Sequence, residues 1–267
     1  MQKKKTVLDF QRMKAEGERI AVLTCYDYPT AAIMDGCGID IILIGDSAGV
    51  VVAGYDNTLP VTMDEMIYHT KAVMRAQPKA FVVADLPFLS YQIDLAGARL
   101  NAGRLIKEAG AAAVKIEGGV NIAETIAAIT AMDIPVMGHI GLTPQSLHRM
   151  GGFKVQGKSE QQAEKLLEDA RAVERAGAFA VVLEGIPMGL AGKITAELSI
   201  PTIGIGAGPS CDGQVLVLHD ILGLCSKYSP KFVKRYAELT PVIAEAVSSY
   251  IADVKGGTFP EERHSFK

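Results

Sequence analysis

Residues 81–85 have the sequence Phe-Val-Val-Ala-Asp, and Pro87 follows shortly after them. This short run shows no alternation of polar and apolar residues, which is typical of a strand buried on both faces of a parallel sheet. Similar runs rich in Val, Ile and Ala, bounded by Gly, Pro or Asp, recur along the chain. The strands predicted in this way are Ile20–Asp27, Asp40–Asp46, Phe81–Asp85, Ala112–Glu117, Pro135–His139, Phe179–Glu184, Thr202–Ile205 and Gln214–Leu218.

Segments with helical periodicity separate most of these strands. Thr62–Arg75 carries acidic residues in its first turn, and both Leu95–Ala109 and Ser159–Ala176 stop before a glycine, which is favoured at a helix C-terminus. Eight strands that alternate with helices predict an α/β protein, a (β/α)₈ TIM barrel rather than an open doubly wound sheet. The interval between Ile205 and Gln214 is too short for a normal helix, so the seventh helix is expected to be short or missing.

The other segments are compatible with one domain. Thr6–Gly17 is expected to form an N-terminal helix that closes the barrel floor, and Lys231–Val254 is expected to form a long C-terminal helix. Gly151–Lys158 has the composition of a loop, and Gly256–Lys267 that of a polar tail. The sequence contains no evident linker, low-complexity tract or internal repeat. We therefore expect a single TIM-barrel catalytic domain over residues 1–267.

The composition argues against several classes of protein. The 267 residues are 49% hydrophobic, which is enough for one sizeable core. A net charge of −3 and an aromatic content of 6% without Trp are unfavourable for binding nucleic acid. No signal peptide and no apolar stretch near the ~20 residues of a membrane span is evident. We expect a cytoplasmic protein with free thiols at its four cysteines, Cys25, Cys37, Cys211 and Cys225.

Polar residues are rare in the predicted strands and fall at their C-terminal ends, the end that carries the chemistry in barrel enzymes. One such residue is often only a turn or helix cap, and for Asp27 that alternative is as good as a functional role. Several carboxylates on one rim would repel each other unless they shared a cation, and carboxylates with water suit Mg²⁺ better than Zn²⁺. The rim residues are Asp27, Asp46, Asp85, Glu117, His139 and Glu184.

Several of these positions leave more than one interpretation open. Lys115 lies two residues before Glu117, so both side chains face the same side of a strand, either in the site or as a structural ion pair. His139 is either functional or a buried core histidine. Glu184 ends an apolar strand, a suitable position for a general base. The loop Gly204-Ile205-Gly206-Ala207-Gly208 either binds a ligand such as phosphate or forms a tight turn in place of the missing helix.

A set of longer motifs runs in order along nearly the whole chain. The set includes Ile44-Gly45-Asp46-Ser47, Thr58-Leu59-Pro60-Val61-Thr62, Tyr68-His69-Thr70, Ala84-Asp85-Leu86-Pro87-Phe88, Val114-Lys115-Ile116-Glu117-Gly118-Gly119, Gly138-His139-Ile140-Gly141-Leu142-Thr143-Pro144-Gln145-Ser146, Gly151-Gly152-Phe153-Lys154-Val155-Gln156-Gly157, Gly204-Ile205-Gly206-Ala207-Gly208 and Glu262-Arg263-His264-Ser265-Phe266. Each fragment alone is a weak signal, but the ordered set is specific. It resembles the ketopantoate hydroxymethyltransferase family.

The resemblance implies a Mg²⁺-dependent enzyme that transfers a hydroxymethyl group from 5,10-methylenetetrahydrofolate to 3-methyl-2-oxobutanoate. The product is 2-dehydropantoate, a precursor of pantothenate and coenzyme A, and the reaction passes through a Mg²⁺-stabilised enolate. The resemblance also implies a homo-oligomer, by analogy a decamer. The roles it implies are metal binding by Asp46, Asp85 and Glu117, substrate binding by Asp46, Ser47, Asp85, Lys115 and His139, and general-base catalysis by Glu184.

Three other functions remain open at the level of sequence. A Schiff-base aldolase would use Lys115 as its nucleophile, would ignore chelators and would be trapped by borohydride. A related magnesium barrel that cleaves 2-keto or phosphonate acids would not depend on folate. A ligand-binding barrel without catalysis would have no use for both a metal site and a base at Glu184.

Overall fold

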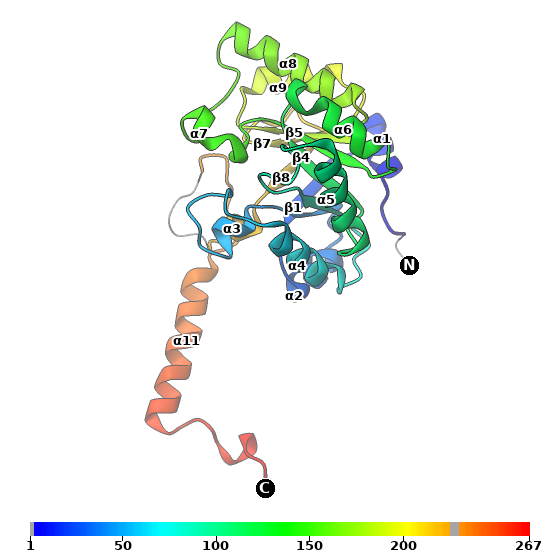
Figure 1. Cartoon of the computed structure of the whole chain (residues 1–267). Helices are drawn as coiled ribbons and strands as arrows, with labels where there is room; N and C mark the ends of the chain where they lie inside the picture. Colours follow the sequence, from blue (N-terminus) through cyan, green and yellow to red (C-terminus); the bar gives the residue numbers. More distant parts are fainter. Residues whose placement is uncertain (1–2, 225–229) are drawn as a thin grey trace. The chain divides into compact units, whose positions relative to one another are not determined.

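The computed structural model describes residues 3–224 and 230–267, which form two compact units, Met1–Val217 and Leu218–Lys267. Unit 1 contains a closed barrel of parallel strands in which each strand pairs with the next and the last pairs with the first (Figure 1). The predicted TIM barrel is thereby confirmed. Its strands are β1 (Ile20–Thr24), β2 (Ile41–Ile44), β3 (Phe81–Asp85), β4 (Ala113–Glu117), β5 (Val136–Gly141), β6 (Ala180–Glu184), β7 (Thr202–Ile205) and β8 (Gly213–Leu216).

The burial of the strands follows from the barrel architecture. Every residue of β2, β3, β4 and β5 is buried, as expected when one face packs inside the barrel and the other under helices. Strands β1 and β8 instead alternate between buried and more exposed residues. They meet at the closing seam, where Ile20 pairs with Gly213. A Cβ atom at Gly213 would lie 2.5 Å from the Ile20 carbonyl oxygen, so the seam requires a residue without a side chain.

Helices connect the strands of unit 1, and those predicted from periodicity are present. Helix α4 begins at a capping box in which the Thr62 side chain accepts a hydrogen bond from the Glu65 amide and the Glu65 carboxylate accepts one from the Thr62 amide. The helices of this unit are α1 (Val7–Glu16), α2 (Tyr28–Gly36), α3 (Ala48–Val51), α4 (Met63–Met74), α5 (Leu95–Lys107), η1 (Val120–Ile122), α6 (Ala123–Thr130), η2 (Pro144–Ser146), α7 (Leu147–Met150), α8 (Glu160–Arg175) and α9 (Met188–Glu197).

The glycine-rich loop joins β7 to β8 without a helix, and all of its residues are described. Gly206 and Gly208 have φ angles of 62° and 85°, in the left-handed region that favours glycine. A Cβ atom at Gly208 would lie 2.6 Å from Met188 Cγ. The loop is therefore a tight turn that packs closely against α9 and takes the place of the seventh helix, as one of the two interpretations of the sequence predicted.

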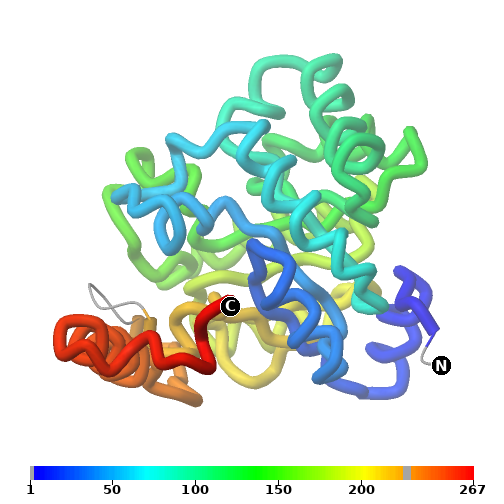
Figure 2. The backbone as a smooth tube through the Cα atoms, turned by 90° about the horizontal axis from the view of Figure 1, so that it is seen from below, coloured from blue at the N-terminus to red at the C-terminus, as the bar shows by residue number. Residues whose placement is uncertain are grey.

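Helix α1 closes the barrel floor, which confirms the prediction for Thr6–Gly17. Phe10 and Met13 are 0% and 1% exposed and belong to the core cluster formed by the inward-facing strand residues. The ring of Phe10 lies 5.4 Å from that of Phe81 and 6.2 Å from that of Phe179, measured between centroids. Figures 1 and 2 show α1, in dark blue, at the end of unit 1 opposite to α3 and α7.

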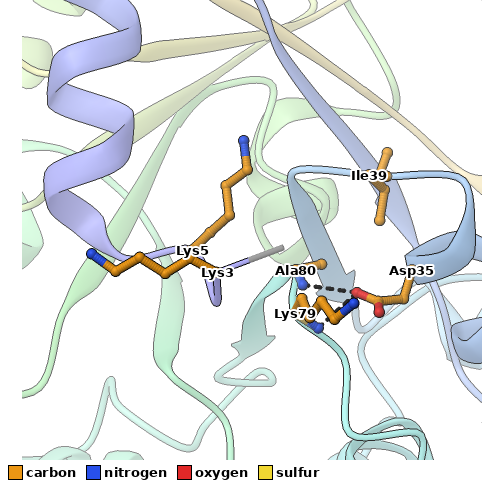
Figure 3. A pocket seen from close by; sticks show the side chains of 7 residues that line it. Lys3, Lys5, Asp35, Ile39, Lys79 and Ala80 are labelled. Carbon is orange, nitrogen blue, oxygen red and sulfur yellow. Dashed lines mark hydrogen bonds between the residues drawn. The ribbon is translucent and has the colours of Figure 1, made fainter. Parts of the chain in front are cut away.

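A small basic hollow lies near the N-terminal ends of the strands (Figure 3). At this hollow the Asp35 carboxylate accepts hydrogen bonds of 2.7 and 2.9 Å from the backbone amides of Lys79 and Ala80. This face serves stability in TIM barrels, and none of the predicted site residues lines the hollow. The lining residues are Lys3, Lys5, Asp35, Gly38, Ile39, Lys79 and Ala80.

The described residues of unit 2 include α10 (Leu218–Ile221), α11 (Leu239–Gly256) and η3 (Glu262–His264). The prediction that the long helix spans Lys231–Val254 was wrong at its start, because α11 begins only at Leu239. Pro241 explains the difference: proline is tolerated in the first turn of a helix but breaks a helix interior. The preceding segment instead bonds to α10 and its end, with the Tyr236 amide donating to the Ile221 carbonyl at 2.8 Å.

Two expectations about the environment of the chain can be compared with the structure. Cys25, Cys37 and Cys211 are free thiols, as expected, whereas Cys225 lies outside the described residues. Within residues 3–224 and 230–267, no helix combines the length and the apolar character needed to cross a membrane. The expectation of a single domain over residues 1–267 stays a prediction.

Candidate active site

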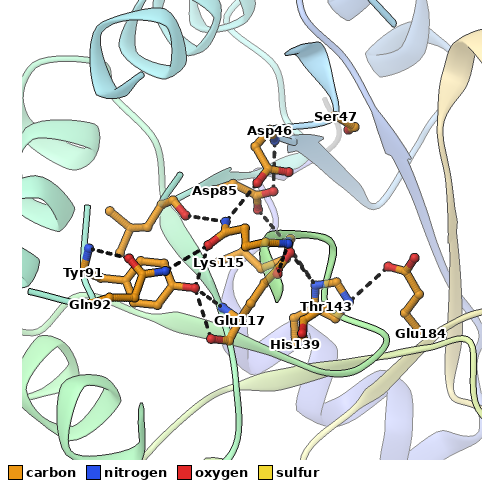
Figure 4. Close-up of polar contacts among 12 residues, drawn as sticks. Asp46, Ser47, Asp85, Tyr91, Gln92, Lys115, Glu117, His139, Thr143 and Glu184 are labelled. Carbon is orange, nitrogen blue, oxygen red and sulfur yellow. Dashed lines mark hydrogen bonds and ion pairs between the residues drawn. The ribbon is translucent and has the colours of Figure 1, made fainter. Parts of the chain in front are cut away.

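Six polar side chains meet at the C-terminal ends of β2 to β6 (Figure 4). Five of them are at most 5% exposed, although each is ionisable. The sixth, Glu184, has a side chain that is 15% exposed. A buried cluster of this kind is stable only when its charges compensate each other. Its members are Asp46 after β2, Asp85 at the end of β3, Lys115 and Glu117 on β4, His139 on β5 and Glu184 at the end of β6.

Five of these side chains, all except that of Asp46, form a continuous chain of charge contacts. The Lys115 ammonium lies 3.0 Å from Asp85 Oδ1 and 3.9 Å from Glu117 Oε1. His139 lies between the two glutamates, with Nδ1 3.4 Å from Glu117 Oε1 and Nε2 3.1 Å from Glu184 Oε2. Lys115 therefore pairs more closely with Asp85 than with Glu117, and His139 links the cluster to Glu184 rather than packing as an isolated core residue.

The surroundings shift the pKa values of these groups. Burial, followed by the charges of Asp85 and Glu117, raises the pKa of Asp46 to about 8. Burial acts to lower the pKa of Lys115, but Asp85, Glu117 and Asp46 outweigh it and raise that pKa above its usual value. Lys115 is therefore held as an ammonium ion. Around Asp46, by contrast, the negative charges of the cluster exceed the positive charges that compensate them.

His139 is stabilised in its charged form. Burial and the Lys115 charge act to lower the pKa of His139, but hydrogen bonding to Glu117 and Glu184 raises it to about 9. In that form both ring nitrogens carry a proton, and each lies within ion-pair distance of a carboxylate, Nδ1 of Glu117 and Nε2 of Glu184. The 3.3 Å contact between Lys115 Nζ and His139 Nδ1 is then a contact of two donors, and it becomes a hydrogen bond only when the ring is neutral with its proton on Nε2.

The carboxylates of Asp46, Asp85 and Glu117 have the character of a Mg²⁺ site. Asp85 Oδ1 and Glu117 Oε1 are buried and take part in no hydrogen bond of ordinary geometry, although Lys115 lies within ion-pair distance of both. Within the described ranges, no three His, Cys, Asp or Glu side chains form a ready-made metal cage. Mg²⁺ does not require one, because it is usually held by one or two carboxylates together with water and substrate. The donor set therefore fits Mg²⁺.

Two further residues predicted from sequence lie outside the cluster. Ser47 directly precedes α3, and its hydroxyl is 2.8 Å from the Tyr26 hydroxyl. Asp27 is the N-cap of α2, where its carboxylate accepts hydrogen bonds from the amide and the hydroxyl of Thr30 at 2.9 and 3.0 Å. Since β1 ends at Thr24, the structural alternative for Asp27 is the one that is observed.

A glutamine and a tyrosine complete the buried network. The Gln145 side chain donates through Nε2 to Asp46 Oδ2 at 2.9 Å, and its backbone amide donates to Glu117 Oε2 at 3.0 Å. The Tyr91 hydroxyl donates to Gln145 Oε1 at 2.8 Å. Both side chains are buried. Gln145 therefore bridges two of the carboxylates that fit a metal ion.

Comparison with known families identifies the barrel. The pattern of the ketopantoate hydroxymethyltransferase family matches residues 4–262. The chain belongs to this family. Its relatives include a protein from Citrifermentans bemidjiense. That protein is 82% identical to this chain over 267 residues, and the match covers 100% of each chain. That relative is named 3-methyl-2-oxobutanoate hydroxymethyltransferase.

Solved structures of other proteins share the fold of this family member. A phosphonopyruvate hydrolase in complex with oxalate and Mg²⁺ aligns with a TM-score of 0.63 and 13% identity, covering 100% of this chain and 92% of that one. A 2,3-dimethylmalate lyase of the PEP mutase/isocitrate lyase superfamily aligns with a TM-score of 0.59 and 16% identity, covering 97% and 91%. At such identities the likeness concerns the barrel fold alone.

The motifs of the ketopantoate hydroxymethyltransferase family contain Gln145, but sequence reasoning gave it no role, and it did not consider Tyr91. Gln145 lies in the η2 turn after β5, and Tyr91 lies in the loop after β3. Neither residue is ionisable near neutral pH, and neither lies at the end of a strand. The search for ionisable residues at strand ends, which identified the carboxylates, therefore did not include them. The only signal in the sequence was that Gln145, like Thr143 two residues before it, belongs to the same motif as His139.

Proposed function

We propose that this chain transfers a hydroxymethyl group from 5,10-methylenetetrahydrofolate to 3-methyl-2-oxobutanoate, forming 2-dehydropantoate. The observation that carries the proposal is the buried chain of Asp85, Lys115, Glu117, His139 and Glu184, in a barrel whose 82%-identical relative bears the name of this activity. The balanced reaction consumes one water molecule, which supplies the hydroxyl oxygen, and releases tetrahydrofolate. The product places the reaction in the biosynthesis of pantothenate.

Asp46 and Asp85 are proposed to hold Mg²⁺, with Glu117 in support. When bound, the ion supplies a Lewis acid that stabilises negative charge on the keto oxygen of the substrate. The buried ammonium of Lys115 compensates the carboxylate of the keto acid or the charge that develops beside it. Ser47 and His139 complete the proposed substrate site, since the Ser47 hydroxyl can donate a hydrogen bond to the keto acid and His139 contributes the positive charge of its imidazolium.

Glu184 is proposed to remove the proton from C3 of the keto acid. His139 Nε2 lies 3.1 Å from Glu184 Oε2, so the charged imidazole ring holds the carboxylate at the edge of the cluster. The Glu184 side chain is more exposed than those of Asp85 and Glu117, at 15% against 3% for each, as a group that must reach a substrate should be. Base catalysis by a positioned carboxylate contributes about 10²–10⁴-fold.

A Schiff-base mechanism has less support. An amine nucleophile requires a lowered pKa, whereas Asp85 and Glu117 overcome the effect of burial and raise the pKa of Lys115. The neutral amine would also have to leave the buried carboxylate of Asp85 without its partner. Such a mechanism would be revealed by borohydride trapping of Lys115 and by activity that survives a chelator.

The direct test is an assay with 3-methyl-2-oxobutanoate and 5,10-methylenetetrahydrofolate, with Mg²⁺ or with a chelator. The proposal expects 2-dehydropantoate only when both substrates and the metal are present. Turnover of the keto acid without folate would instead indicate a lyase or hydrolase of the kind found among the structural neighbours. Absence of turnover, with keto acid binding retained, would indicate a binding protein.

The proposal extends to the state of the protein in the cell. We expect a cytoplasmic homo-oligomer, with a decamer as the form implied by the family. Light scattering on the purified 28.4 kDa chain at micromolar concentration measures the number of subunits. A mass equal to that of one chain would contradict the oligomer without affecting the proposed chemistry.

A further inference from the structure

Gln145 uses the full hydrogen-bonding capacity of its side-chain amide inside the site. Its Nε2 donates to Asp46 Oδ2 at 2.9 Å and to the Leu86 carbonyl at 3.0 Å. Its Oε1 accepts from the Tyr91 hydroxyl at 2.8 Å and from Gln92 Nε2 at 3.2 Å. An amide has two donors and two acceptor sites, so none remains for a substrate.

These partners also fix which way the amide points. Rotating it by half a turn would place Oε1 against Asp46 Oδ2 and the Leu86 carbonyl, three acceptors together, and Nε2 against the donors on Tyr91 and Gln92. The backbone amide of Glu117 donates to the Tyr91 hydroxyl at 3.3 Å. The single hydroxyl proton has two acceptors within reach, Gln145 Oε1 at 2.8 Å and the Glu117 carbonyl at 3.1 Å, and the contact to Gln145 is the shorter. The contacts with Asp46 Oδ2 and the Leu86 carbonyl, which can only accept, therefore fix the observed orientation.

The three carboxylates share a pattern in which one oxygen is tied to the protein. Gln145 holds Asp46 Oδ2 through its side chain and Glu117 Oε2 through its backbone amide, and the Asp46 amide donates to Asp85 Oδ2 at 3.1 Å. Asp85 Oδ1 and Glu117 Oε1 are the oxygens without an ordinary hydrogen bond. At Asp46, the contact with Gln145 leaves Oδ1 as the oxygen that a cation can use.

We propose that Gln145, held in place by Tyr91, is the positioning residue that orients Asp46 and Glu117 for the divalent cation. The inference rests on the proposed function, because it assumes that these carboxylates bind a metal ion. Gln145 acts through the carboxylates and touches neither the substrate nor the reacting atoms. Partners of this kind, one shell beyond the ligands, typically contribute about 10- to 100-fold to metal affinity.

The test replaces Gln145 with methionine, which has a similar length and no amide. The dissociation constant for Mg²⁺ is measured by titration calorimetry on the whole chain without substrate. We expect Gln145→Met to weaken Mg²⁺ binding by about 10- to 100-fold. In the assay, the Mg²⁺ concentration at half-maximal activity should rise by the same factor, while kcat at saturating Mg²⁺ should approach that of the wild type.

The matched control is Gln161→Met on the exposed surface of α8, which should bind Mg²⁺ as the wild type does. A Gln145→Met protein that binds Mg²⁺ within about twofold of the wild type would overturn the inference and leave the proposed metal site standing, since a purely structural role changes stability and not affinity. A wild-type chain that binds no Mg²⁺ would overturn the metal site and the inference together.

Tyr91→Phe provides the same test if Gln145→Met does not fold. It removes the hydroxyl that donates to Gln145 Oε1, while Gln92 remains as a second donor to that oxygen. The same hydroxyl also contacts the backbone amide and carbonyl of Glu117, at 3.3 and 3.1 Å. We expect a smaller loss of Mg²⁺ affinity, about two- to tenfold, as for one neutral hydrogen bond. Unchanged affinity in a folded Tyr91→Phe protein would overturn the role of Gln145 as held by Tyr91.

Discussion

Asp46 accepts a hydrogen bond from Gln145, and an asparagine at this position can keep that bond while removing the negative charge. Asp46→Asn should therefore fold normally and lose at least about 100-fold in activity at low Mg²⁺, because a direct ligand matters more than the residue that orients it. Calorimetry with Mg²⁺ and activity as a function of Mg²⁺ concentration measure the effect.

The control for this variant is Asp64→Asn on α4, whose side chain is 86% exposed and whose pair with Arg104 contributes little. Activity of Asp46→Asn equal to that of the control at low Mg²⁺ would exclude Asp46 as a ligand. Asp85 is less suitable for the same experiment. Its loss would leave the buried ammonium of Lys115 without its closest partner, at a cost of about 3–5 kcal/mol in the free energy of unfolding.

At the scale of residues, strand ends predicted most of the site because parallel strands bring their C-terminal ends together. The rule placed Asp46, Asp85, Glu117 and Glu184 correctly in one cluster. It gave no answer for Asp27, since a carboxylate that caps a helix and one that faces a site have the same sequence signature. The hydrogen-bond partners within the cluster depend on side-chain conformations, which no sequence pattern encodes.

Among the elements, the loop that replaces the seventh helix offers a test of tight packing. Gly208 and Gly17 both have a positive φ, at 85° and 70°. A Cβ atom at Gly208 would lie 2.6 Å from Met188 Cγ, whereas one at Gly17 would meet nothing within 4 Å. Alanine at either position should lower the free energy of unfolding by about 1–2 kcal/mol through backbone strain. Gly208→Ala should lose about 1–3 kcal/mol more through overpacking.

Urea denaturation of the two variants measures this difference. Equal losses for Gly208→Ala and Gly17→Ala would mean that Met188 and its helix move aside without cost, and that the loop is not tightly packed against α9. The absence of a helix between β7 and β8 was predictable, because chain length alone excludes it. The close approach of Gly208 to Met188 was not, because it joins residues from different connections of the barrel.

For the molecule as a whole, the barrel floor depends on Phe10, which is fully buried between the rings of Phe81 and Phe179. Phe10→Ala should lower the free energy of unfolding by about 3–5 kcal/mol. Leu8 lies on the same helix but is 69% exposed, so Leu8→Ala should change it by no more than about 0.5 kcal/mol. Denaturant unfolding of both variants tests the prediction, and similar small losses would show that α1 does not close the core.

The architecture of the barrel was predictable from sequence because its signals are repetitive. Eight apolar runs, most of them separated by a helix, follow one alternating pattern, so an error at one boundary does not alter the fold. The start of α11 was not predicted, since apolar periodicity continues through the segment before Leu239 and only Pro241 marks the true beginning. Pro241 therefore indicates the start of α11 more reliably than the apolar periodicity does.

Proton exchange at C3 of 3-methyl-2-oxobutanoate in deuterated water tests the proposed chemistry most directly, because it requires the metal and the base but not the folate. We expect exchange with Mg²⁺ and none with a chelator. We also expect a fall of roughly 100-fold or more in Glu184→Gln, which keeps the shape of the side chain beside His139 but cannot take the proton. Exchange that persists without Mg²⁺, or that is unchanged in Glu184→Gln, would contradict the proposed chemistry.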